Sequence, residues 1–376
     1  MPQNITIQIN PELLTWAREE AGYTPEDIAA KLHIPAERYI RWERNREEVP
    51  LGMMKRVSNY YKRQLAVFVL PTPPPRMKKP NDYRNLAISQ AGLSPEILLA
   101  MRRANKYLTM ARDILGEEYW INQYQWQTEI ENFKIGQTNR FDNRFLDWLR
   151  GKLQINIKEQ KRFRGTEDAY RNWRNSIERE LGIFIFQFNM PEKEVDGFCY
   201  ADENPPYAIV INKNKKAPRK IFTIFHELAH IIRHQSGICL TEFSAEDHGN
   251  ELECNYFAGK FLVPDNEVVP ISNMEELSTI AHKYKVSREV YLRRNLERDF
   301  ISRSEFFKIL GELRELPIPP KKTDKEIRIL PPVASKSTRG EKFYNLILNA
   351  VYNNEIDYFS ASDALGLGFS YIAANE

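Results

Sequence analysis

The chain has 376 residues, which at about 100–200 residues per domain predicts two or three domains. Its 54 basic and 51 acidic residues leave a formal net charge of +3, which excludes a strongly cationic nucleic-acid coat protein but not a local basic face. Hydrophobic residues account for 42% of the chain and aromatic residues for 12%, so a wholly disordered chain is excluded. The three cysteines exclude a disulfide scaffold and are typical of a reducing compartment.

The first residues of the sequence contain neither the basic stretch nor the apolar stretch of a signal peptide. The longest apolar run, Leu65–Leu70, is far shorter than the roughly 18–20 residues that a membrane span requires. We therefore expect a cytoplasmic protein with no membrane partner.

Short helices are predicted for the first 70 residues, because their start and stop signals follow one another closely. Pro11 stands where a first helical turn tolerates proline, and Gly22 ends the apolar spacing of that helix. Thr24 and Pro25 look like an N-cap followed by a proline at the first helical position. The predicted helices cover about residues 11–21, 25–32, 35–46 and 51–61.

A proline-rich stretch follows this helical region. Four prolines within residues 71–75 cannot continue a helix or a central strand, and basic residues come directly after them. We interpret residues 71–83 as a stiff linker and as the clearest domain boundary. Residues 84–164 contain few glycines or prolines, which predicts a helical scaffold segment in which we find no chemistry.

The pattern changes to short strands at about residue 182. Strand-like runs cover residues 182–188, 198–200 and 207–212, and helical periodicity returns over 221–234, 251–264 and 274–315. The C-terminal part is expected to form an α/β tail, with a strand over 327–330 and one or two helices. These elements predict a mostly helical α+β protein, divided at residues 1–70, 71–83, 84–164, 165–318 and 319–376.

The strongest chemical motif is His226-Glu227-Leu228-Ala229-His230, which matches H-E-x-x-H. Residues i and i+4 of a helix share one face, so two imidazoles at this spacing can bind one Zn²⁺. Apolar side chains surround the motif, which predicts a buried helix whose polar groups need a partner such as a metal. Glu227, beside the first histidine, is placed to take a proton from a metal-bound water.

A catalytic zinc also needs a third protein ligand. His234 follows His230 by four residues, but three residues stacked along one straight helix cannot converge on one ion. The better candidate is Glu251 in the next predicted helix, where Asn255 one turn later would orient a ligand. Glu253 lies on a different face of that helix and is the alternative ligand.

The sequence over about residues 165–300 resembles the ImmA/IrrE metallopeptidase family. The resemblance is carried by Ile211-Asn212, by the stretch from Ile221 to His230, and by Glu251-Leu-Glu-Cys-Asn-Tyr-Phe-Ala258 with Leu262-Val-Pro264. It implies a gluzincin-like fold in which His226, His230 and Glu251 bind zinc and Glu227 is the general base. It also implies cleavage or inactivation of repressor proteins in stress response and mobile-element control. The stretch over 340–366 is similar to a C-terminal segment that these proteins often carry.

Residues 9–70 resemble the XRE-type helix-turn-helix family, through Gly22-Tyr-Thr24, Ile28-Ala-Ala-Lys-Leu32 and Ile40-Arg-Trp-Glu43. The resemblance implies a recognition helix over 35–46 that offers Arg38, Arg41 and Arg44 to double-stranded DNA. The net charge of this module is less favourable for DNA binding, since residues 12–48 contain six basic and nine acidic side chains. DNA affinity depends largely on phosphate neutralisation, so the module would need a clustered basic face or a homodimer, or would dock a partner protein instead.

Two functions are compatible with these motifs. The first is a zinc-dependent endopeptidase that cleaves a repressor-like protein, with an extended substrate pairing beside the strand over 207–212. The second is a DNA-binding transcription regulator or antitoxin-like protein whose metal site is structural or vestigial. The two differ at Glu227, because a purely structural metal site needs no general base.

Overall fold

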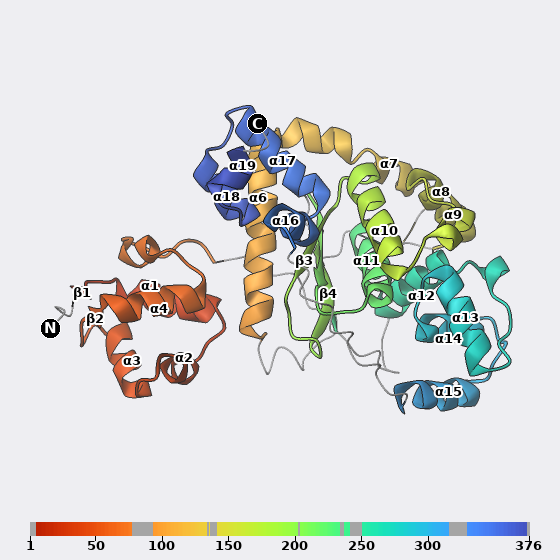
Figure 1. Cartoon of the computed structure of the whole chain (residues 1–376), viewed down its shortest axis with the longest axis horizontal. Coiled ribbons are helices and arrows are strands. Elements are labelled where there is room, and N and C mark those ends of the chain that lie inside the picture. The colour runs from red at the N-terminus through yellow and green to blue at the C-terminus, as the bar shows by residue number, and fades with distance from the viewer. Residues whose placement is uncertain are drawn as a thin grey trace. The chain divides into compact units, whose positions relative to one another are not determined.

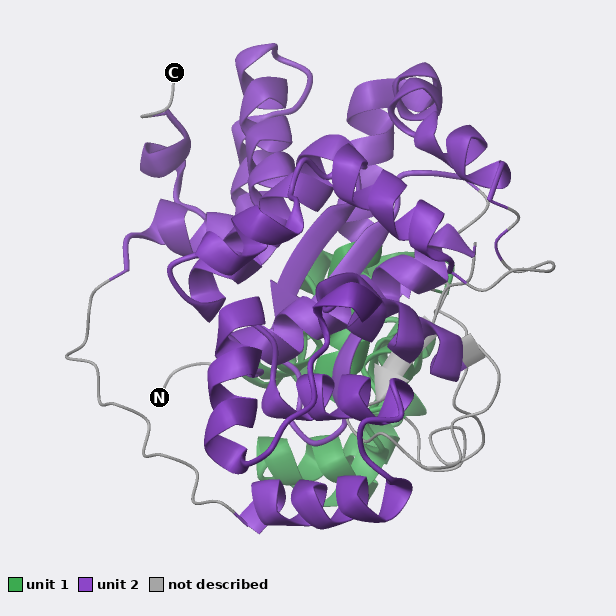
Figure 2. Ribbon diagram, turned by 90° about the vertical axis from the view of Figure 1, so that its right-hand side faces the viewer, with its two compact units in different colours: residues 1–79, 85–105 green, residues 80–84, 106–376 purple. Residues whose placement is uncertain are grey.

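The computed structural model describes residues 5–76, 93–133, 135, 141–201, 204–233, 237–240, 250–315 and 329–373, with the backbone alone for 237–240 and 250. The described chain is mostly helical with small sheets, which confirms the predicted α+β class. It divides into two compact units, residues 1–79 with 85–105 and residues 80–84 with 106–376 (Figure 2). Among the described helices, none has the length and apolar character needed to cross a membrane.

The first unit is built from short helices whose boundaries follow local signals in the sequence (Figure 1). Asn10 caps the first helix through its side chain, and Gly22 follows it with a φ of 74°. Thr24 and Asp27 form a capping box at the start of the second helix. The elements are β1 (Thr6–Ile7), α1 (Pro11–Glu20), α2 (Pro25–Leu32), α3 (Ala36–Glu43), β2 (Val49–Pro50), α4 (Leu51–Tyr61) and η1 (Leu65–Val69).

The core of this unit is aromatic and aliphatic. Tyr39, Trp42 and Tyr61 are almost completely buried, and the hydroxyl groups of Tyr39 and Tyr61 lie 2.6 Å apart in a hydrogen bond. The pairing satisfies two hydroxyl groups that would otherwise be buried without a partner. Burial raises the pKa of both phenols, so both stay neutral at physiological pH.

The third helix is shorter than predicted. The expected span was 35–46, but α3 ends at Glu43 because Arg44 leaves the helical conformation and Asn45 adopts a φ of 52°. Arg44 is thus the residue after the last helical turn and does not lie on the helix. Arg38 and Arg41 remain within α3.

The second unit is organised around a four-stranded sheet. Its strands are β3 (Phe184–Phe188), β4 (Val195–Tyr200), β5 (Ala208–Asn212) and β6 (Gly237–Leu240), in the order β3-β5-β4-β6. Strand β5 pairs in parallel with β3 and antiparallel with β4, and β6 pairs antiparallel with β4. The expectation that an extended substrate pairs with 207–212 is therefore wrong, because both edges of β5 are already occupied. Strands β3 and β6 are the two edges of the described sheet.

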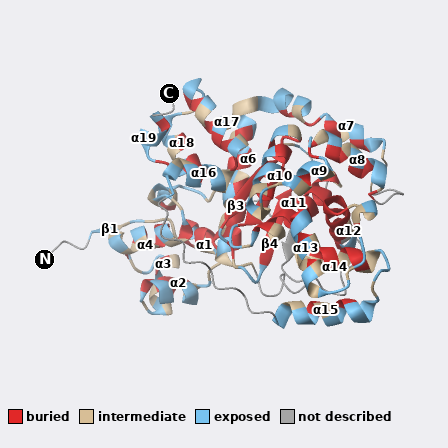
Figure 3. Cartoon of the chain, turned by 45° about the vertical axis from the view of Figure 1, so that its right-hand side comes forward, coloured by how far each residue is buried: buried red, intermediate tan, exposed pale blue. Residues whose placement is uncertain are grey.

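Three helices form the layer beside this sheet, with α11 at its centre. Helix α11 (Ala217–Ile232) contacts β4 and β5, α10 (Thr166–Glu180) contacts α11 and β3, and α12 (Asn250–Leu262) contacts α11. Gly197 in β4 permits the close approach, since a Cβ atom there would lie 2.7 Å from the Thr223 side chain. Figure 3 shows that buried residues are concentrated in α10, α11 and the strands of the sheet.

The described chain contains further helices outside this layer. They are α6 (Pro95–Gln123), α7 (Trp126–Glu131), α8 (Asn143–Lys152), α9 (Ile157–Arg162), η2 (Asp265–Glu267), α13 (Met274–Tyr284), α14 (Arg288–Glu297) and α15 (Arg303–Glu315). The division between the two units falls inside α6, after Asn105, and the backbone of α6 is broken at Gly116. Most of the expected linker over 71–83 lies outside the described residues.

The C-terminal segment is part of the second unit, and its described residues are helical. The described part consists of α16 (Pro331–Arg339), α17 (Glu341–Tyr352), α18 (Tyr358–Leu365) and α19 (Phe369–Ala373). The sequence predicted an α/β tail, and this prediction is wrong for the described C-terminal residues, which are helical and form no strand. Of the strand expected over 327–330, the first two residues lie outside the described chain. Ile329 and Leu330 are not in a strand, and Leu330 is the N-cap of α16.

A buried carboxylate anchors this segment. Glu178 in α10 accepts hydrogen bonds from the backbone N–H groups of Ile185, Glu341 and Lys342, so one side chain joins α10, β3 and the start of α17. Phe343 of α17 packs with its ring centroid 5.6 Å from that of Phe186 in β3. Burial raises the pKa of Glu178, and the three N–H groups oppose that shift.

Candidate metal centre

The helix that carries the H-E-x-x-H motif is buried on all sides. Helix α11 begins after Lys216, has Pro218 in its first turn, and buries every side chain from 220 to 232. His226 and Glu227 are 0% exposed and His230 is 1% exposed. Polar groups this deep in an apolar helix require partners from neighbouring elements.

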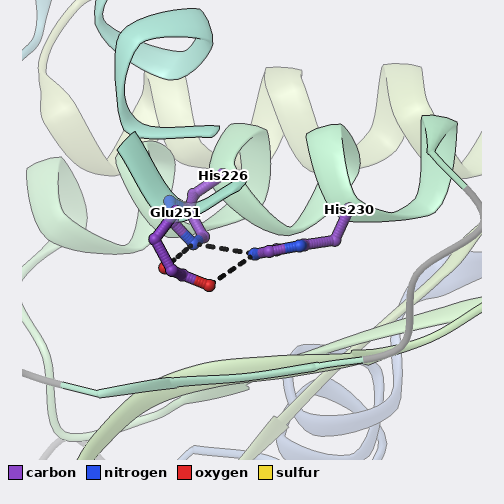
Figure 4. A group of neighbouring side chains, drawn as sticks. All are labelled: His226, His230 and Glu251. Atoms are coloured by element: carbon purple, nitrogen blue, oxygen red, sulfur yellow. Dashed lines mark hydrogen bonds and ion pairs between the residues drawn. The ribbon is translucent and has the colours of Figure 1, made fainter. Parts of the chain in front are cut away.

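The partner is Glu251 from α12 (Figure 4). The Nε2 atoms of His226 and His230 lie 3.2 Å from each other. The carboxylate oxygens of Glu251 lie 3.2 Å from His226 Nε2 and 3.1 Å from His230 Nε2. A tetrahedral zinc ion with bonds of 2.0–2.1 Å holds its ligand atoms about 3.3 Å apart. The three donors thus already have the spacing of one triangular face of a zinc site.

The protonation of His226 is set by Asn255. Its Nδ1 atom lies 2.9 Å from Oδ1 of Asn255, an oxygen that can only accept a hydrogen bond. His226 therefore carries its proton on Nδ1, and the lone pair of Nε2 points toward His230 and Glu251. A ligand histidine held through its other nitrogen is the usual arrangement in metal sites.

The electrostatics of the group also fit a cation. Burial alone would raise the pKa of Glu251, but its contacts with the two histidines outweigh burial and lower it. Burial lowers the pKa of His230, which favours the neutral imidazole that binds metals. An ionised carboxylate facing two neutral nitrogens in a buried site leaves negative charge and lone pairs directed at one point. A divalent cation such as Zn²⁺ satisfies all three donors at once.

Glu253, the alternative ligand, is directed to a different partner, because it forms an ion pair with Arg233. Among the residues that the structure describes, His226, His230 and Glu251 are the group with the composition and spacing of a metal site. His234, which the sequence disfavoured as a ligand, lies outside the described residues.

The candidate DNA-contacting arginines are engaged within their own unit. Nε of Arg38 lies 2.7 Å from one carboxylate oxygen of Glu47, and Nε of Arg41 lies 3.0 Å from the other. The two arginines therefore share one acidic partner, and the pKa of Glu47 is lowered by their hydrogen bonds. Arg44 is exposed beyond the end of α3. Sequence analysis missed Glu47, because a pairing six and nine residues away depends on the turn after α3.

Taken together, the fold and the site define a metallopeptidase-type domain joined to a helix-turn-helix module. Residues 178–295 match the family model described as the IrrE N-terminal-like domain of peptidase family M78, and residues 14–68 match the helix-turn-helix model. The chain therefore contains an IrrE-like peptidase domain and an N-terminal helix-turn-helix domain, which confirms the two resemblances seen in the sequence. Comparison with curated proteins and with solved structures gave no match.

Proposed function

We propose that the chain is a zinc-dependent endopeptidase that cleaves a repressor-like regulatory protein. The observation that carries the proposal is the convergence of His226, His230 and Glu251 at zinc-ligand spacing, with Glu227 next to the first histidine on the same buried helix. The match of this region to a peptidase family supports the same conclusion.

The roles of the residues follow from their chemistry. His226, His230 and Glu251 would hold the ion, which supplies a Lewis acid for the scissile carbonyl and for the attacking water. Glu227 takes a proton from that water on a carboxylate oxygen and passes it to the nitrogen of the leaving amine. Asn255 keeps the imidazole of His226 in the tautomer that leaves Nε2 available.

The sheet topology supports a place for a peptide substrate at the outer edge of β6. Strand β6 is the last strand in the order β3-β5-β4-β6, and its only partner among the described strands is β4. An extended substrate segment would add to the outer edge of β6 through main-chain hydrogen bonds. This replaces the strand over 207–212, which is internal to the sheet.

We assign DNA docking to the helix-turn-helix unit. Arg38 and Arg41 on α3, with Arg44 just after it, are the cations that would contact phosphates or bases. A DNA-bound module would hold the peptidase near repressors on the same DNA. The family match of residues 14–68 supports this role.

Metal content and cleavage test the enzymatic proposal together. Wild-type protein and Glu227→Gln should each contain about one zinc per chain, whereas His230→Ala should contain little. Wild type incubated with a lysate should produce new protein N-termini that Glu227→Gln does not, with Glu253→Gln as a control outside the group. A wild-type protein that binds zinc but yields no such N-termini would favour a regulator with a structural metal site.

A further inference from the structure

The Nδ1 atoms of the two histidines of the site contact different partners. The Nε2 atoms of both rings converge on Glu251, so both Nδ1 atoms point away from it. Nδ1 of His226 is bound to Asn255 at 2.9 Å. Nδ1 of His230 lies 3.7 Å from Sγ of Cys254, the residue directly before Asn255.

An imidazole that offers the Nε2 lone pair to a cation carries its proton on Nδ1. That N–H group is buried at His230, and buried donors in folded proteins are hydrogen-bonded. The sulfur of Cys254 is within the range of an N–H···S contact. We infer that Cys254 is a positioning residue for His230. The sulfur of Cys254 accepts a hydrogen bond from the Nδ1–H group of His230 and so favours the tautomer that leaves Nε2 available. This inference rests on the proposed metal site.

Helix α12 places the necessary groups on one face. Glu251, Cys254 and Asn255 stand at positions i, i+3 and i+4, so they line the side of α12 that contacts α11. One helical turn thus supplies a ligand and the acceptors for both ligand histidines. Cys254 acts through His230 and contacts neither substrate nor ion, because its sulfur faces the nitrogen opposite the one that meets Glu251.

The inference differs from a simple packing role in a measurable way. Cys254 is 0% exposed, so a side chain that only fills space should be replaced better by alanine than by the more polar serine. A hydrogen-bond acceptor should instead be replaced by serine, whose hydroxyl can accept from Nδ1–H, and not by alanine. The two roles therefore predict opposite orders of zinc affinity for the serine and alanine variants.

The test compares full-length wild type, Cys254→Ser and Cys254→Ala by competition for Zn²⁺ with a chromophoric chelator. Removing such an outer partner weakens metal binding about 10–100-fold, and the weakness of sulfur as an acceptor places Cys254→Ala near 10-fold. Cys254→Ser should stay within about 2-fold of wild type. The visible absorption of Co²⁺-loaded protein should change in Cys254→Ala, and Glu253→Gln should match wild type in both measurements.

The outcomes separate this inference from the proposed function. If Cys254→Ala binds zinc as tightly as wild type with an unchanged Co²⁺ spectrum, Cys254 has no positioning role although the metal site stands. Zinc binding that is weakened in the serine variant as much as in the alanine variant, or more, would likewise assign Cys254 to packing. A wild-type protein that binds no metal would overturn the metal site itself. Far-ultraviolet circular dichroism of each metal-free variant checks that the chain is folded.

Discussion

Releasing Arg38 and Arg41 from Glu47 should strengthen DNA binding. Both ion pairs are partly exposed, with 37% and 48% of the arginine side chains accessible, and exposed pairs contribute about 0.2–1 kcal/mol each. Glu47→Gln removes the competitor for two cations at once, so DNA affinity should rise about 2- to 30-fold, at 1.4 kcal/mol per factor of ten.

The salt dependence of binding gives a second, independent measure. Each additional phosphate contact steepens the slope of log K against log salt by about 0.9, so two released arginines should steepen it by up to about 1.8. Fluorescence anisotropy with a labelled duplex at several salt concentrations measures both quantities. Because the phosphate contribution does not depend on sequence, a random duplex is sufficient.

Glu48→Gln is the matched control, because it removes the same charge from the neighbouring residue. Glu48 accepts a hydrogen bond from the hydroxyl of Thr6, and within the described part of the chain the arginines of α3 form their ion pairs with Glu47 instead. The reasoning is refuted if Glu47→Gln leaves affinity and slope unchanged, or if both variants change them equally. In the second case the net charge of the module, and not the pairing with two arginines, controls binding.

Three further predictions concern the second unit. Asn255→Ala leaves the Nδ1–H group of His226 without its acceptor, so zinc affinity in chelator competition should fall about 10–100-fold; an unchanged affinity would contradict the assigned tautomer. Trp173→Ala removes a 0% exposed ring that packs 5.0 Å from Phe225 on the motif helix, and should lower the free energy of unfolding in urea by about 3–5 kcal/mol. A loss below about 1 kcal/mol would show that the site helix does not depend on this contact. Burial alone would raise the pKa of Asp265, but its lysine and arginine partners outweigh burial and lower that pKa. The ionised carboxylate therefore stabilises the fold above its ordinary pKa of 3.8, and this stabilisation is lost as the pH falls further. Asp265→Asn should therefore be less stable than wild type at pH 7, with a difference that narrows below about pH 4 in thermal unfolding.

Local sequence signals determined much of this molecule. The N-cap Thr24 with Pro25 and the stop at Gly22 predicted the helices of the first unit, because capping and left-handed turns involve residues within one or two turns. The i, i+4 spacing of His226 and His230 placed both imidazoles on one helical face for the same reason.

The pairing of distant segments was decided by tertiary structure alone. Strand 207–212 looked accessible in the sequence, yet β5 lies between β3 and β4, because strand order depends on which hydrophobic faces pack together. The anchoring of the C-terminal segment by Glu178 joins residues more than 160 positions apart, and no local pattern encodes it.

The metal site lies between these two cases. Sequence spacing determined which residues of each helix share a face, and it placed Glu251 and Asn255 on the same side of α12. Only the packing of α12 on α11 brought that face to the histidines, paired Glu253 with Arg233 instead, and set the sulfur of Cys254 beside His230. Helical periodicity is a property of a few neighbouring residues, whereas the contact of two helices depends on side chains from the whole core.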